Sequence, residues 1–69
     1  MLKIDITTIR SLMALDAEFD EVVSELVKSH DKMQESDSYE DIALYALQAG
    51  KLEKRAQQIF NQALEVLNG

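Results

Sequence analysis

The sequence contains no cysteine, no proline and no tryptophan, and it has only two glycines and one histidine. Without cysteine the chain can form neither a disulfide nor a thiolate metal site, and a single histidine cannot build a zinc site alone. His30 lies at the edge of an apolar helical face, and we interpret it as an ordinary boundary residue. We therefore predict no metal ion and no cofactor. No spacing typical of catalytic residues occurs, so the sequence does not indicate an enzyme.

The chain also lacks a long apolar run and an excess of positive charge. No stretch approaches the roughly 18 apolar residues that a membrane span requires, and the first five residues do not have the pattern of a signal peptide. Thirteen acidic residues against seven basic residues give a net charge of −6. Such a surface repels the phosphates of nucleic acids and anionic lipids. These absences predict a cytoplasmic protein that binds neither nucleic acid nor a membrane.

The chain is short for a self-sufficient fold. Sixty-nine residues allow one domain at most, and a domain of this size buries only about 60% of the surface of its unfolded chain. With neither a disulfide nor a metal, association with another chain is the remaining source of stability. A hydrophobic content of 46% argues against disorder. We expect a folded domain whose partner is another protein or a second copy of itself.

Apolar residues recur at helical spacing in the first half of the chain. They follow one another in steps of three and four over residues 9–33, and the strict alternation of a strand is absent. Asp5 is a suitable N-cap for this helix, with Thr7 or Thr8 as alternative starts. The pattern predicts a first helix at about residues 6–34.

The polar stretch from Glu35 to Ser38 is where the chain can turn. Two pairs have the spacing of a capping box: Ser38 with Asp41, and Asp37 with Glu40. We place the turn at about residues 35–37 and a second helix at about 38–67. Because a short linker makes consecutive helices antiparallel neighbours, the predicted fold is an all-α antiparallel helical hairpin in one domain over residues 1–69.

Folding at this turn sets the bulky residues of the first helix against small residues of the second. Leu26 then lies near residues 46–49, and Phe19 lies near residues 52–56. Large side chains that meet an alanine column fill a core and allow two helix axes to approach closely. The predicted hairpin core consists of Leu12, Phe19, Leu26, Met33, Ala49, Leu52, Ala56, Ile59 and Ala63.

Charge favours the same antiparallel pairing. Four carboxylates lie within residues 16–21, and the only basic cluster is formed by Lys51, Lys54 and Arg55. The hairpin places these two blocks side by side, whereas a parallel arrangement separates them. Each exposed pair contributes only about 0.2–1 kcal/mol, so the pairing selects the orientation more than it adds stability.

One segment of the second helix is apolar on every side. This segment, Ile42 to Leu47, cannot be covered by a single neighbouring helix. Leu44 and Leu47 lie off the heptad stripe, so the hairpin should leave them exposed beside Tyr39. Two exposed leucines near an aromatic residue are typical of a protein-binding hot spot. Tyr39, Leu44 and Leu47 are therefore the predicted partner-binding residues, with burial in a homodimer as the alternative.

The order of these features is also that of a known family. An amphipathic helix, a polar turn, an early aromatic residue (Tyr39) and the run from Leu52 to Phe60, of the Leu-Glu-x-x-x-Ala-x-x-Ile type, follow one another. In length and plan the chain resembles the small two-helix co-chaperones of the type III secretion needle subunit. The resemblance implies that the protein joins a larger, repeat-built chaperone and helps to hold a needle subunit unpolymerised in the bacterial cytoplasm.

Two functions of different classes follow from the sequence. The first is a non-enzymatic protein–protein interaction module, such as a cytoplasmic co-chaperone or adaptor of a bacterial secretion system. The second is a self-associating structural or regulatory protein, in which two hairpins form a four-helix bundle homodimer. The apolar excess near Leu44 favours the first function, and the small core of a single hairpin favours the second.

Overall fold

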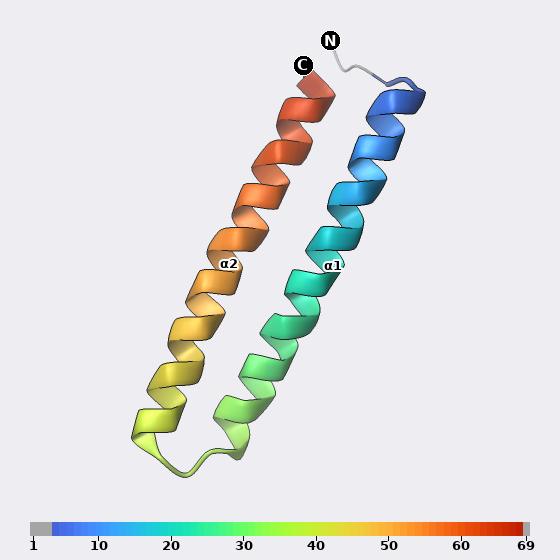
Figure 1. Ribbon diagram of the computed structural model, residues 1–69. Helices are drawn as coiled ribbons and strands as arrows, with labels where there is room; N and C mark the ends of the chain where they lie inside the picture. The colour runs from blue at the N-terminus through green and yellow to red at the C-terminus, as the bar shows by residue number, and fades with distance from the viewer. Residues whose placement is uncertain (1–3, 69) are drawn as a thin grey trace.

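The computed structural model describes residues 4–68 and shows two helices joined by a short turn (Figure 1). The helices are α1 (Ile6–Glu35) and α2 (Tyr39–Asn68), each 30 residues long. The start of α1 and the end of α2 lie at the same end of the molecule, so the helices run antiparallel (Figure 1). The predicted all-α antiparallel hairpin is confirmed. α1 begins at the predicted residue 6, and its end and both bounds of α2 lie one residue later than predicted, which is within the usual uncertainty of a helix end.

Each helix begins at a capping side chain. Asp5 caps α1, because its carboxylate accepts a hydrogen bond of 2.8 Å from the backbone N–H of Thr8. Ser38 caps α2, where its hydroxyl accepts a 3.5 Å hydrogen bond from the backbone N–H of Asp41 and its carbonyl accepts one of 3.0 Å from that of Ile42. These bonds satisfy N–H groups that have no partner within the helix. Polar residues at both predicted starts therefore fix where the helices begin.

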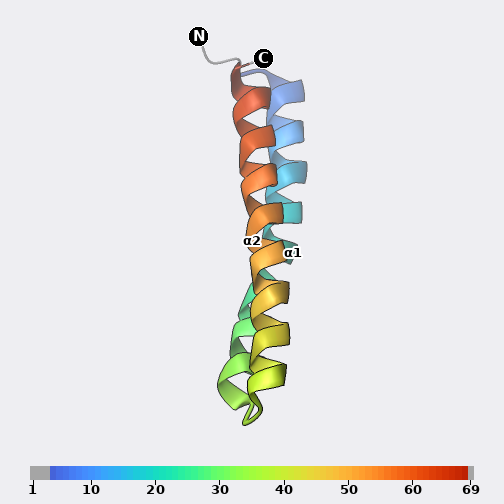
Figure 2. The same cartoon turned by 90° about the vertical axis from the view of Figure 1, so that its left-hand side faces the viewer.

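The hairpin is long and narrow. The Cα atoms span 50 × 15 × 11 Å. Viewed edge-on, the two helices cross each other at a shallow angle (Figure 2). Seven-residue apolar spacing produces this arrangement, because it keeps one stripe of each helix directed at its neighbour along the whole length.

The core is one contact layer between the helices. Among residues 4–68 the buried apolar side chains are Val22 and Ile59, and Thr8 and Ser29 are buried with them. Thr8, Val22 and Ser29 belong to one column of α1 with a seven-residue spacing, and this column faces α2 most directly. Two of these three residues are polar, so an apolar pattern does not reveal them.

Of the nine residues of the predicted core, one is buried, seven are half-buried and one is exposed. Ile59 is 2% exposed, whereas Phe19 remains 36% exposed. The other seven are half-buried: Leu12, Leu26, Met33, Ala49, Leu52, Ala56 and Ala63. The predicted column of α1 thus flanks the contact with α2 and does not form its centre, and for Phe19 the prediction of a core position is corrected to a partly exposed edge.

The register of Phe19 also differs from the expected one. Its side chain shares a hollow with Ile59 and Phe60, about one turn beyond the residues 52–56 expected opposite it. Helical side chains lean toward the N-terminus of their own helix. In an antiparallel pair this lean carries a long side chain of α1 toward the C-terminal end of α2.

Neither helix, over the part of the chain that the structure describes, is long and apolar enough to cross a membrane.

Candidate partner-binding surfaces

The three residues predicted to bind a partner are all exposed. Tyr39 is 91% exposed at the start of α2, and Leu44 and Leu47 are 59% and 65% exposed. Ile42, Tyr45 and other half-buried residues turn toward α1, which leaves both leucines on the outer side of α2. We call Leu44 and Leu47 the outer patch. Exposed leucines one helical turn apart are a surface that a protein partner can cover.

A hollow runs along the outer patch and has both apolar and charged walls. Its lining residues are Asp41, Leu44, Tyr45, Leu47, Gln48 and Lys51. Tyr39 is not among them, so the structure separates it from the two leucines with which the sequence grouped it. Opposite charges at positions 41 and 51 frame the apolar floor at its two ends, as the polar rim of a binding site does.

Two polar contacts join α1 to α2, an ion pair and a cation–π contact. Glu18 of α1 and Arg55 of α2 form an ion pair, the one that joins the two helices among residues 4–68. The Lys32 ammonium lies 6.0 Å from the centre of the Tyr45 ring, within the range of a cation–π contact. The acidic and basic blocks do meet, as predicted. Within the described residues the two blocks are joined by this single pair, and Lys51 and Lys54 form no ion pair there.

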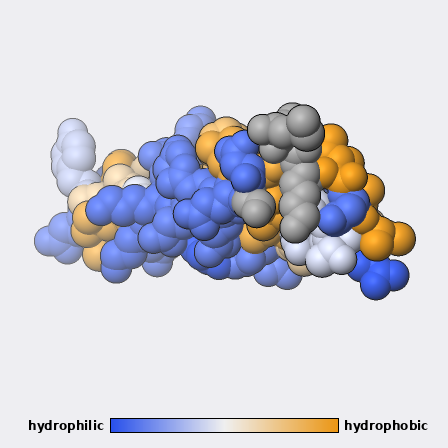
Figure 3. All heavy atoms as spheres, turned by 90° about the horizontal axis from the view of Figure 1, so that it is seen from above, coloured by the Kyte–Doolittle hydropathy of each residue, from blue (hydrophilic) through white to orange (hydrophobic). Residues whose placement is uncertain are grey.

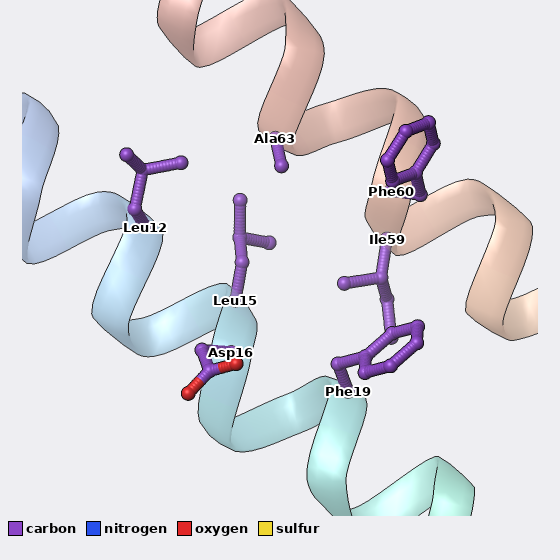
Figure 4. Close-up of a pocket in the computed structure, with 7 residues that line it drawn as sticks. All are labelled: Leu12, Leu15, Asp16, Phe19, Ile59, Phe60 and Ala63. Atoms are coloured by element: carbon purple, nitrogen blue, oxygen red, sulfur yellow. The ribbon is translucent and has the colours of Figure 1, made fainter.

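A second apolar surface lies beside the helix–helix contact, on the flank opposite the hollow of the outer patch. Here Leu12, Leu15 and Phe19 of α1 form a hollow with Ile59, Phe60 and Ala63 of α2, and Asp16 lies at its edge. Figure 4 shows Leu15 directed at Ala63 and Ile59 directed toward the space beside Phe19, while the Asp16 carboxylate points away from α2. The hollow is therefore open and apolar with one acidic group at its border.

This hollow continues into a wider apolar surface. We call it the apolar face; it consists of Ile9, Phe19, Val23 and Val27 of α1 with Phe60 and Leu64 of α2, which are between 36% and 55% exposed. Figure 3 looks down on the end of the hairpin where α1 starts and α2 ends, and there hydrophobic side chains lie at the right of the view and hydrophilic side chains cover much of its centre. The predicted partner-binding residues did not include this face, and Phe19 was predicted to lie in the hairpin core. Its signal in the sequence is an apolar stripe on α1 broader than one neighbouring helix can cover.

Neither surface carries a constellation typical of chemistry at a metal. Over residues 4–68 no group of three or more histidine, aspartate or glutamate side chains is placed to hold a metal ion. His30 is exposed. Both surfaces therefore offer apolar area with charged borders, which is suited to protein contacts.

Comparisons with known proteins do not add a relative. The chain matches no protein-family model, no curated protein and no solved structure. The hairpin and its two apolar surfaces are therefore the features that indicate its function.

Proposed function

We propose that this chain is a non-enzymatic protein–protein interaction module that binds its partner through the outer patch. The observation that carries this proposal is the exposure of Leu44 and Leu47 on the side of α2 that α1 does not cover. Burial of one leucine side chain contributes about 1.5–3 kcal/mol. Two adjacent leucines can therefore anchor a helix or an apolar groove of another protein, and the charges of Asp41 and Lys51 can orient it.

The resemblance to two-helix co-chaperones gives this proposal a narrower form. In that form the hairpin acts in the bacterial cytoplasm as a co-chaperone or adaptor of a secretion system. The outer patch docks on a larger, repeat-built chaperone. Tyr39 lies outside the hollow and supplies a separate aromatic contact next to the turn.

The test compares two double variants of α2 in a pull-down from the native host. Leu44→Asp with Leu47→Asp places two charges in the outer patch, whereas Gln58→Asp with Asn61→Asp places two charges at the equivalent positions two heptads later. We expect the first variant to lose the protein that the unmodified chain captures and to keep its helical circular dichroism. The control variant should retain that protein.

Two results contradict the proposal. Capture of the same protein by all three chains shows that the outer patch does not bind it. Loss of helicity in the Leu44 and Leu47 variant alone shows that these leucines belong to a folded core and not to a docking surface.

A further inference from the structure

The hairpin exposes more surface than a compact domain of its mass. A folded monomer of 7.8 kDa exposes about 4,400 Å², but this hairpin exposes 5509 Å². Its radius of gyration is 15.8 Å, against about 11 Å for a compact domain of this length. The excess of about 1,100 Å² is more than the roughly 800 Å² that each partner contributes to a stable protein–protein interface. One hairpin thus has the area for a second layer of helices.

The apolar face also has the position that a four-helix bundle requires. On α1 the residues that contact α2 and the column of Ile9 and Val23 are separated by about a quarter turn of the helix. In a four-helix bundle each helix contacts two neighbours through two such stripes. α1 has both stripes, but α2 covers only the first of them.

We propose that a second copy of this chain covers the apolar face, so that two hairpins form a four-helix bundle. In this bundle α1 of each copy lies on α2 of the other, and both turns lie at the same end. The outer patch remains outside the bundle, so this inference is independent of the function proposed for Leu44 and Leu47.

The apolar face of one copy can pack against the same face of a second copy, because matching residues lie at the same height along the hairpin axis. The Glu18–Arg55 ion pair marks one level of the antiparallel hairpin, and each step back along α1 corresponds to a step forward along α2. Ile9 is therefore level with Leu64, and Val23 is level with Gly50. A two-fold axis parallel to the helices preserves these levels, so the same residues of the two copies meet reciprocally.

Gly50 fits this contact and has no explanation within one hairpin. Glycine inside a helix costs about 1 kcal/mol relative to alanine, and a Cβ at position 50 would meet nothing within 4 Å. The contact between α1 and α2 does not need the missing side chain. In the proposed bundle, Val23 of the second copy occupies the space beside it.

The neighbour of Gly50, and not charge, distinguishes this arrangement from the one with the two turns at opposite ends. With both turns at the same end, Asp16 of one copy meets the level of Gln57 of the other, whose amide can donate a hydrogen bond. With the turns at opposite ends, each helix would lie on its own counterpart about its midpoint. Asp20 would then be near Asp20 of the second copy and Glu53 near Glu53; with both turns at the same end, Asp20 of one copy is level with Glu53 of the other, so like charges meet in both arrangements.

The first test is sedimentation equilibrium of the full chain and two variants. We expect a dimer for the unmodified chain and an increase of about 100-fold or more in its dissociation constant for Val23→Asp, which places an unpaired charge in the contact. The variant with Leu44→Asp and Leu47→Asp should remain a dimer. A monomer for the unmodified chain, including one that needs a different protein to cover the face, overturns the inference, and so does a dimer that is unaffected by Val23→Asp.

The second test distinguishes the two arrangements by disulfide formation. Since the chain has no cysteine of its own, only the introduced cysteines can form a disulfide. A mixture of the Val23→Cys and Gly50→Cys chains should form a cross-linked heterodimer on oxidation, and neither chain alone should do so. Asp20→Cys serves as the comparison. Efficient cross-linking of Asp20→Cys to itself, with none in the mixture, shows that the copies pair with their turns at opposite ends. That result contradicts the proposed bundle.

Discussion

Ile59 is the side chain on which the contact between the helices depends most. It is 2% exposed, and it reaches the space beside Phe19 and Leu15 at the centre of the hollow (Figure 4). The other buried apolar residue among those described is Val22, so few side chains share the packing. Because the core is so thin, the loss of one side chain removes a large part of the total packing between the helices.

We expect Ile59→Ala to lower the free energy of unfolding by about 2–4 kcal/mol, because it removes buried methyl groups and leaves a cavity. Leu47→Ala is the matched control, since it also truncates an aliphatic residue of α2 but at an exposed position, and it should change stability by about 0.5 kcal/mol or less. Urea unfolding followed by circular dichroism measures both. Equal midpoints for the two variants would contradict the burial described for Ile59.

The Glu18–Arg55 pair should act on orientation and contribute little to stability. Both side chains are more than a third exposed, so solvent and salt screen their attraction. We expect Arg55→Glu to cost at most about 1 kcal/mol at low salt, because it puts like charges together. Adding Glu18→Arg to that variant should restore most of the loss, and high salt should abolish the difference. A double variant no more stable than the single one would show that the pair does not form.

At the scale of the element, local signals predicted the helices well and their facing sides less well. Asp5 and Ser38 determine the starts through hydrogen bonds to nearby N–H groups, so residue type and spacing suffice to find them. The rotation of α1 toward α2 depends on the packing of the whole molecule. Because the apolar stripe of α1 is broader than the contact, spacing alone cannot select which third of it faces inward. The prediction accordingly chose the column of Phe19 over that of Val22.

Of the two apolar surfaces, the outer patch could be predicted from the sequence and the apolar face could not. Leu44 and Leu47 could be predicted as exposed, because they lie off the heptad stripe of α2. The apolar face was missed, since its residues look like ordinary core residues in a sequence. Thr8 and Ser29 were missed for the opposite reason: they are polar, yet they lie in the most buried column.

The cap of α2 provides a test of which of the two capping boxes operates. Ser38→Ala removes the hydroxyl that accepts from Asp41, and we expect a loss of about 0.5–2 kcal/mol in thermal or urea unfolding. Asp37→Ala should cost less, because the Asp37 side chain makes no hydrogen bond within the described residues and contributes only its charge near the helix start. A larger loss for Asp37→Ala would transfer the capping role to that residue.

At the scale of the whole molecule, the hairpin is one contact layer with apolar surface on two other sides. Stable domains bury each apolar stripe against another element, and here α1 has a second stripe that α2 does not reach. We infer that the second copy supplies the missing layer and that the outer patch stays available for a different protein. In that state one bundle would present two outer patches.

The most direct test of this account is the thermal melting of the unmodified chain at concentrations from about 1 µM to about 100 µM, followed by circular dichroism. Because association stabilises the folded state by mass action, the account predicts a melting temperature that rises steadily with chain concentration. A sharp melt at one temperature across the whole range, with the chain monomeric throughout, would contradict it.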